Sequence, residues 1–181
     1  MKRRAPWRIP LSDFIGNYID GRAEEEYAPI WACARDPRSL GRAAWQAADG
    51  GYAVHGLIDF EPDGTFVLLA PNREACGFYM DAQCWIDPAH RGQKLSTPLI
   101  LAAAAHLGDT PVRDAHWGVG FSDAGLKAHI AAWRHAVGEA LAAGRPVPGS
   151  VLREFRELAG DASTPRHRAP RLVPASPHPT P

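Results

Sequence analysis

The sequence predicts an α+β fold in which helices flank a mixed, mostly antiparallel central sheet, in α/β/α layers. Three strand-like runs, 52–60, 65–70 and 75–86, are separated only by short turn signals, and consecutive hairpins of this kind form an antiparallel meander. The segment 99–107 is apolar on nearly every face, which is typical of a buried helix. Further helical patterns lie before and after these elements, so helices are available to cover the sheet.

Composition indicates one globular domain and argues against several classes of protein. The chain has 181 residues, of which 45% are hydrophobic and 22% charged, and its net charge is zero. A neutral chain does not suggest a dedicated nucleic-acid binder, so nucleic acid is not an expected partner. The sequence contains neither an apolar run long enough to span a membrane nor an apolar stretch behind its basic N-terminus. Its three cysteines are widely spaced and odd in number, which favours a reducing compartment, and we expect a cytoplasmic protein.

The N-terminal part is predicted to be an arm followed by helices. Residues 1–10 are basic and contain two prolines, so they form either a short strand around 7–9 or a disordered arm. Residues 11–27 carry apolar side chains at helical spacing. Residues 29–48 are predicted to be helical on both sides of a break at Asp36-Pro37.

Turn chemistry sets the limits of the three strands. In 61–64, Glu-Pro-Asp-Gly, the proline presets φ and the glycine accepts a positive φ, which predicts a turn after the first strand. A second turn is expected at 71–74. The third strand is predicted to run without interruption over 75–86, until Asp87-Pro88 ends it.

A helix, a strand and a second helix are predicted to follow. Ser96 or Thr97 supplies the N-cap oxygen of the buried helix, and Gly108 is suited to end it. A strand is expected at 112–121 and a helix at 124–143.

Composition also divides the chain into four parts. A basic N-terminal arm and a main domain are followed by a linker with a short amphipathic helix, and then by a tail rich in proline and without aromatic residues. Such a tail cannot bury enough apolar surface to order itself, so it is predicted to be disordered. In chain order, these parts are residues 1–10, 11–144, 145–160 and 161–181.

The loop before the buried helix is a candidate anion site. Residues 91–96, Arg-Gly-Gln-Lys-Leu-Ser, lead into a helix N-terminus, whose unpaired N–H groups and dipole favour an anion such as phosphate. Arg91 and Lys94 would add two positive charges. The alternative interpretation is an ordinary strand-to-helix turn whose charged side chains are solvated.

Residues 90–108, HRGQKLSTPLILAAAAHLG, resemble the central motif of the GCN5-related N-acetyltransferase (GNAT) superfamily. In that motif an Arg or Gln is followed, three and five places later, by Gly and by Gly or Ala. Here Arg91 takes the first place, and Lys94 and Ser96 take the other two. Glycine lets the backbone approach a ligand closely, so Lys94 is the larger departure. The order of predicted elements over residues 10–140 is also similar to that of the family.

The resemblance implies an acyltransferase that uses acetyl-CoA or another acyl-CoA as co-substrate. The acceptor is expected to be an amine, and the sequence does not identify it. In this family the loop wraps the CoA pyrophosphate, and a backbone N–H of the preceding strand, here near Trp85 or Ile86, stabilises the oxyanion. The binding residues that the resemblance implies are Trp85, Ile86, Arg91, Gly92, Gln93, Lys94, Leu95 and Ser96.

The family's usual proton donor is missing from its expected place. Many members carry an Asn and, seven residues later, a Tyr that protonates the leaving thiolate, but Ser122 and His129 occupy these positions here. His129 is the titratable substitute in register, because histidine can donate a proton near neutral pH, and the alternative is an exposed helix residue. For the base, placement near strand ends favours Glu74, Asp81 and His116, and spacing singles out none of them.

A non-enzymatic alternative remains open. A structural or binding protein, of phage or mobile-element type, could use the same core, with the basic arm and the proline-rich tail as contact segments. Side chains would then fill the cleft that an acyltransferase keeps open.

No two of the eight histidines have i,i+3 or i,i+4 spacing, so no metal site is predicted. A nucleophilic Cys84 would need a lowered pKa.

Overall fold

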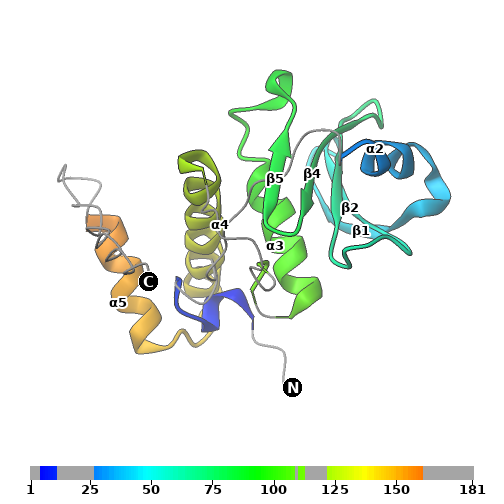
Figure 1. The fold of residues 1–181 in the computed structure, drawn as a ribbon. Helices are drawn as coiled ribbons and strands as arrows, with labels where there is room; N and C mark the ends of the chain where they lie inside the picture. Colours follow the sequence, from blue (N-terminus) through cyan, green and yellow to red (C-terminus); the bar gives the residue numbers. More distant parts are fainter. Residues whose placement is uncertain (1–4, 12–26, 109, 113–121, 161–181) are drawn as a thin grey trace, which may run out of the picture.

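The computed structural model describes residues 5–11, 27–108, 110–112 and 122–160, which build layers of helices around one sheet (Figure 1). Helices of the 3-10 type carry the label η. In chain order the elements are η1 (Pro6–Arg8), α2 (Ala28–Arg35), η3 (Pro37–Ser39), β1 (Leu40–Gln46), β2 (Ala53–Leu57), β3 (Phe66–Leu69), β4 (Ala75–Met80), β5 (Gln83–Ile86), η4 (Pro88–His90), α3 (Ser96–Leu107), α4 (Asp123–Ala142) and α5 (Gly149–Gly160).

The five strands form one antiparallel sheet in the order β1-β2-β3-β4-β5. Each strand pairs with the next along the chain, so the meander that the turn signals predicted is confirmed, together with the α+β class. All pairings among the described strands are antiparallel. Of the strand predicted at 112–121, residues 113–121 lie outside the described part of the chain.

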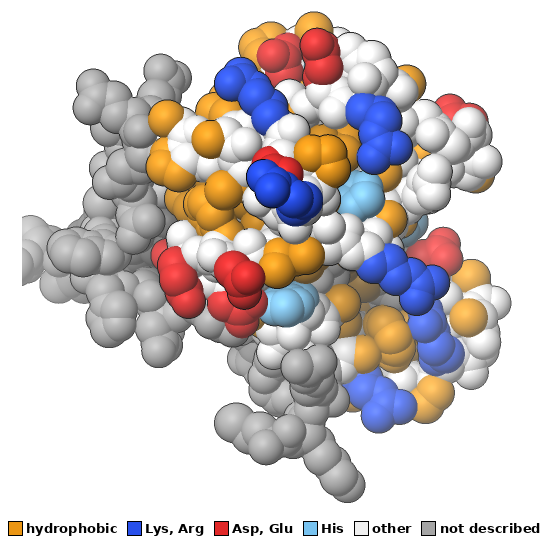
Figure 2. All heavy atoms as spheres, turned by 90° about the vertical axis from the view of Figure 1, so that its right-hand side faces the viewer, with side chains coloured by type: hydrophobic (Ala, Val, Ile, Leu, Met, Phe, Trp, Pro, Cys, Tyr) orange, Lys and Arg blue, Asp and Glu red, His pale blue; other side chains and the backbone are white. Residues whose placement is uncertain are grey.

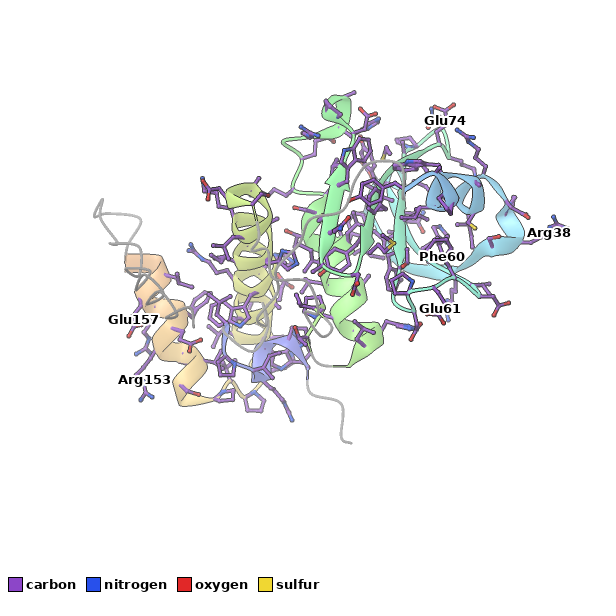
Figure 3. All side chains as sticks on the ribbon, in the orientation of Figure 1. Arg38, Phe60, Glu61, Glu74, Arg153 and Glu157 are labelled. Atoms are coloured by element: carbon purple, nitrogen blue, oxygen red, sulfur yellow. The ribbon has the colours of Figure 1, made fainter. Side chains whose placement is uncertain are left out.

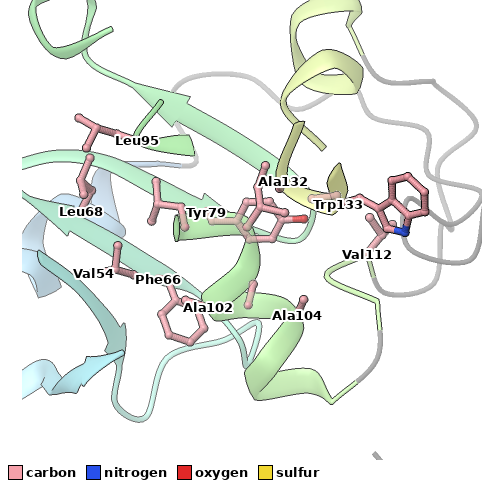
Figure 4. Packing of buried hydrophobic residues seen from close by; sticks show 14 of the residues in the cluster. Val54, Phe66, Leu68, Tyr79, Leu95, Ala102, Ala104, Val112, Ala132 and Trp133 are labelled. Atoms are coloured by element: carbon pink, nitrogen blue, oxygen red, sulfur yellow. The ribbon is translucent and has the colours of Figure 1, made fainter. Parts of the chain in front are cut away.

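Helices cover both faces of the sheet. On one face, Ile30 of α2 shares a buried cluster with Phe78 of β4. On the other, Leu99 of α3 and Trp133 of α4 belong to a larger cluster, into which Tyr79 of β4 projects toward α4 (Figure 4). Because neighbouring residues of a strand point to opposite faces, β4 contributes to both cores.

The predicted helix over the second half of 29–48 is wrong, because residues 40–46 form strand β1. The Ala-rich sequence Leu-Gly-Arg-Ala-Ala-Trp-Gln has no strong strand propensity, and pairing with β2 overrides its helical preference. From Gly41 to Gln46, half-buried and exposed residues alternate with a period of two. The helix α2 and the break at Asp36-Pro37 are confirmed.

The single strand predicted over 75–86 is also wrong, because a tight turn divides it into the hairpin β4–β5. Asp81 and Ala82 form the turn with φ values of 48° and 71°. Two consecutive positive φ angles give the turn whose twist suits a two-residue hairpin, and Asn or Gly usually marks it. Only Asp81, which tolerates a positive φ, is a turn residue here, so the sequence signal for the turn is weak.

The ends of the later helices largely follow the sequence prediction. Gly108 ends α3 with φ of 79°. The Ser122 hydroxyl caps α4 by accepting a hydrogen bond from the Gly125 N–H at 3.1 Å. The expected Ser96 or Thr97 cap of α3 is wrong, because Leu95 occupies the cap position and no side chain bonds the helix N-terminus.

The described part of the N-terminal arm, residues 5–11, is neither a strand nor disordered. It forms the 3-10 helix η1 and packs on α4, where the Trp133 indole donates a hydrogen bond to the Ile9 carbonyl at 3.1 Å. The Leu11 N–H donates to Glu154 of α5 at 2.7 Å. Of the predicted helix 11–27, residues 12–26 lie outside the described part, as does the tail 161–181. Within the described segments, no helix is long and apolar enough to cross a membrane.

Candidate functional site

The loop between η4 and α3 adopts an unusual backbone conformation. Gly92 and Lys94 have φ angles of 81° and 59°, both in the left-handed region. Glycine reaches this region without a steric penalty, whereas a long side chain such as lysine is uncommon there. Lys94 therefore has a backbone conformation that glycine adopts more easily than other residues do.

The same loop lines a shallow depression with polar and charged residues. Within the described part of the chain, the backbone N–H groups of residues 94–96 donate to no backbone carbonyl. They lie at the start of α3, where the helix dipole favours negative charge. The depression has a volume of about 300 Å³ and is lined by Ile86, His90, Arg91, Gly92, Lys94, Leu95 and Ser96.

Arg91 is fixed against the end of β5. Its Nε donates a hydrogen bond to the Ile86 carbonyl oxygen at 2.8 Å, and the side chain is exposed. The two terminal nitrogens of the guanidinium keep their N–H donors for another acceptor. Arg91 can therefore contribute both a positive charge and a two-donor fork to an anion in the depression.

Tyr52, which the sequence analysis did not single out, holds the loop from the side of the sheet. Its hydroxyl lies 2.9 Å from Nδ1 of His90 and accepts a hydrogen bond from the Gln93 amide at 3.2 Å. The Gln93 side chain thus contacts Tyr52 and does not line the depression. Tyr52 is about forty residues from the loop, so no local motif could have revealed this contact.

The outer edge of β5 presents the backbone of Ile86. The Asp87 N–H donates to the Cys76 carbonyl at 2.8 Å, and Ile86 is the next residue, opposite Gly77. Because hydrogen-bonded and non-hydrogen-bonded pairs alternate in an antiparallel ladder, the N–H of Ile86 points away from β4. The Trp85 N–H points toward β4 and is not offered to a ligand. Of the two predicted oxyanion donors, the structure therefore leaves Ile86.

Trp85 and Glu74 come together at a different place. Their side chains line a pocket of about 740 Å³ on the face of the sheet that α2 covers. Glu74 is exposed, and its Oε2 accepts a hydrogen bond from Asn72 at 2.7 Å. The predicted site is thus split, with the anion loop on one face of the sheet and Glu74 with the Trp85 ring on the other.

His129 lies in the core, so the alternative that it is an exposed helix residue is wrong. Its side chain has no exposed surface; Nδ1 lies 2.8 Å from the Gly125 carbonyl and Nε2 lies 3.0 Å from the Tyr79 hydroxyl. Burial lowers the pKa of His129 to about 4. The imidazole is therefore neutral at pH 7, and the structure does not support the imidazolium donor expected from the sequence.

The Tyr79–His129 contact is a second feature that the sequence analysis missed. The family motif predicts an acid seven residues after Ser122, and it does not point to tyrosines earlier in the chain. Tyr79 belongs to β4 and His129 to α4, and only the packing of α4 on the sheet joins them. Contacts between residues so far apart leave no periodic signal.

The remaining candidates add no further reactive group. Burial raises the pKa of the Cys84 thiol to about 12 and that of Cys76 to about 11, so neither is a thiolate at neutral pH. Asp81 forms the β4–β5 turn. His116 lies outside the described residues. Within the described segments, no group of three His, Cys, Asp or Glu side chains could hold a metal ion.

Comparison with known proteins does not assign the chain to a family. No protein-family model, no curated protein and no solved structure matches it. The similarity to the GNAT superfamily therefore rests on the loop motif and the order of elements in the sequence.

Proposed function

We propose that this protein is a cytoplasmic, acyl-CoA-dependent N-acyltransferase of the GNAT type. Its anion loop binds the pyrophosphate of acetyl-CoA or another acyl-CoA, and an amine attacks the thioester directly. The bound thioester supplies an activated acyl group, and the protein positions donor and acceptor and stabilises the developing oxyanion.

The observation that carries the proposal is the backbone of Lys94. The family motif places glycine at this point, and the lysine here is the main departure in sequence. The φ angle of 59° lies in the left-handed region, which glycine reaches without a steric penalty, and this supports the proposal. Gly92, Lys94, Leu95 and Ser96 line the same depression as Arg91, at the start of α3, where a phosphate ligand would be favoured.

The outer edge of β5 supports the second half of the ligand. Among the described strands β5 is at the edge of the sheet. An extended chain that carries amide groups can add to a sheet edge through main-chain hydrogen bonds, and the pantetheine arm of CoA is such a chain. The N–H of Ile86 points outward at the end of this edge, next to the loop. It is the donor that we assign to the thioester oxygen.

A binding protein without catalysis is the second candidate. The buried, neutral His129 favours a protein without catalysis, because a neutral imidazole does not supply the acid that the family motif places at this position. A protein of this kind could retain CoA binding or lose it. If it retains CoA binding, the absence of acylated product distinguishes it from an acyltransferase. If it has lost CoA binding, the binding measurement itself distinguishes the two.

Amide hydrogen exchange with and without CoA tests the proposal at single residues. Saturating CoA is expected to slow exchange at Ile86 and at residues 92–96, because these N–H groups then have acceptors. The amides of α5 serve as the internal control and should not change. Unchanged exchange throughout 83–96 would contradict the proposed donor site.

A further inference from the structure

The larger pocket lies on the other side of the sheet from the anion loop. It has a volume of about 740 Å³ and opens between α2, the β3–β4 turn and the end of β5. On this side of the molecule, positive, negative and hydrophobic side chains are interspersed (Figure 2). The lining side chains that matter here are Trp31, Arg35, Arg73, Glu74, Trp85 and Asp87.

The charges around this pocket are not paired with one another. Within the described part of the chain, neither Arg35 nor Arg73 forms an ion pair, although the neighbouring Arg38 bonds Asp36 at 2.9 Å. Glu74 accepts from an asparagine amide through Oε2 alone. Both signs of charge are thus available to a ligand in one pocket.

The floor of the pocket is aromatic and held in place. The Trp31 and Trp85 rings meet edge to face with centroids 5.4 Å apart, and each also contacts the Phe78 ring. Phe78 belongs to β4 and is fully buried on the face of the sheet that α2 covers. A floor of this kind accommodates an apolar or aromatic side chain without rearrangement.

The pocket adjoins the edge where the thioester is expected. Trp85 and Asp87 line it and are the residues on either side of Ile86, whose N–H points outward. Asp87 accepts a hydrogen bond from the Ala89 N–H through Oδ1, which leaves its second oxygen to another donor. An amine held in this pocket would therefore lie beside the two residues that flank Ile86.

We propose that this pocket is the acceptor site and that the acceptor is an amino acid or short peptide with a free amine and a free carboxylate. This inference rests on the proposed acyltransferase function. Glu74 and Asp87 bind the ammonium, Arg35 and Arg73 bind the carboxylate, and the two tryptophans contact the side chain. Ligands of this class carry one positive and one negative charge, and the pocket is lined by residues of both signs.

The transfer step balances with these groups. The ammonium gives one proton to Asp87, and the neutral nitrogen attacks the thioester carbonyl carbon. The C–N bond forms, the C–S bond breaks, and the CoA thiolate takes one of the two protons on the attached nitrogen. The products are an N-acylated peptide and CoA, and Asp87 returns its proton to water.

Binding is measured first, without CoA. Phenylalanine, Ala-Phe and Ala-Ala-Phe are titrated into the full chain while the indole N–H signals of Trp31 and Trp85 are followed by NMR. We expect saturable shifts of both signals, and at least tenfold weaker binding when the amine of Ala-Phe is acetylated or its carboxylate is amidated. The inference is overturned if none of the three free ligands shifts these signals, or if the blocked dipeptides bind equally well.

Charge variants identify which end each residue binds. Glu74→Gln is expected to reduce the penalty of acetylation, and Arg73→Gln the penalty of amidation, because Asp87 and Arg35 remain at the respective ends. Figure 3 shows Glu74 near α2, whereas Arg153 and Glu157 lie on α5 at the other side of the molecule. Arg153→Gln and Glu157→Gln are therefore matched controls and should leave both penalties unchanged. Equal effects of the control and pocket variants contradict the assignment.

Acetyl-CoA is then added, and N-acetyl-Ala-Phe is sought by mass spectrometry. If CoA binds and the free ligands do not, the acceptor site is overturned while the donor site stands. If the peptides bind and CoA does not, the acyltransferase itself is overturned. If both bind and no product forms, the pocket is not an acceptor site. Acetylated product that is lost in Glu74→Gln but not in Glu157→Gln supports the inference.

Discussion

The Nε of Arg91 donates a hydrogen bond to the carbonyl oxygen of Ile86 at 2.8 Å, so the cation of the anion loop is tied to the outer edge of β5. The same peptide edge offers the Ile86 N–H to a ligand. A phosphate at the loop and an extended chain on the strand would therefore meet at one fixed corner of the molecule. This corner is the centre of the proposed donor site.

Replacing Arg91 should weaken CoA binding. We expect Arg91→Ala to lower the CoA affinity by roughly 1.5–3 kcal/mol, about 10- to 150-fold, because a charge-assisted bond to phosphate is lost. Arg91→Lys should fall between wild type and Arg91→Ala, since it keeps the charge and loses the fork. Calorimetric titration measures all three, with Arg153→Ala as the exposed control on α5. An affinity unchanged in Arg91→Ala would remove this residue from the site.

Lys94 should carry measurable backbone strain. Lys94→Gly and Lys94→Ala both remove the charge, and only glycine relieves the positive φ of 59°. We expect Lys94→Gly to be more stable than Lys94→Ala by about 1 kcal/mol in urea unfolding. Both should bind CoA more weakly than wild type. Equal stability of the two variants would show that the loop relaxes out of the left-handed region.

Gly77 should be required for the position of β5. A Cβ at this residue would lie 2.9 Å from the Trp85 carbonyl oxygen, so the two strands must separate to admit alanine. We expect Gly77→Ala to lower the free energy of unfolding by roughly 1–3 kcal/mol. Gly138 lies inside α4, and a Cβ added there would meet no heavy atom within 4 Å, so Gly138→Ala is the control. It should stabilise the chain by roughly 0.5–1 kcal/mol, and a similar gain in Gly77→Ala would contradict the close approach.

His129 should make stability depend on pH below neutrality. Its pKa of about 4 in the folded chain is below the ordinary value of 6.5, so between these values the unfolded chain binds a proton that the folded chain does not. The stabilisation is fully present above pH 6.5 and is lost as pH falls toward 4, by roughly 2–4 kcal/mol. Urea unfolding at pH 5 and pH 7 should show a smaller difference for His129→Gln than for wild type. His135→Gln, at an exposed position of α4, should keep the wild-type difference.

The sequence was sufficient where local chemistry determines structure. Turn residues located β2 and β3, and the apolar run and Gly108 located α3. The strand β1 was not predictable, because its Ala-rich sequence favours a helix and only the ladder with β2 makes it extended. The β4–β5 turn was missed because Asp81-Ala82 contains no glycine or asparagine, and aspartate followed by alanine is a weak turn signal.

The candidate site was predictable only in part. The loop motif located residues 91–96, which the structure gathers around one depression, apart from Gln93. Which N–H of β5 faces outward depends on ladder register, which sequence alone does not fix. Tyr52 and Tyr79 reach the loop and His129 through tertiary packing, so their roles could not be seen in any local pattern.

Calorimetric titration of the wild-type chain with CoA and with acetyl-CoA tests the central claim most directly. The account predicts binding of both in the micromolar range, with an affinity that falls as salt is raised, because phosphate contacts by Arg91 and Lys94 are screened. Absence of binding to either ligand, in a sample whose folding is confirmed by its cooperative unfolding, would contradict the donor site and with it the acyltransferase assignment.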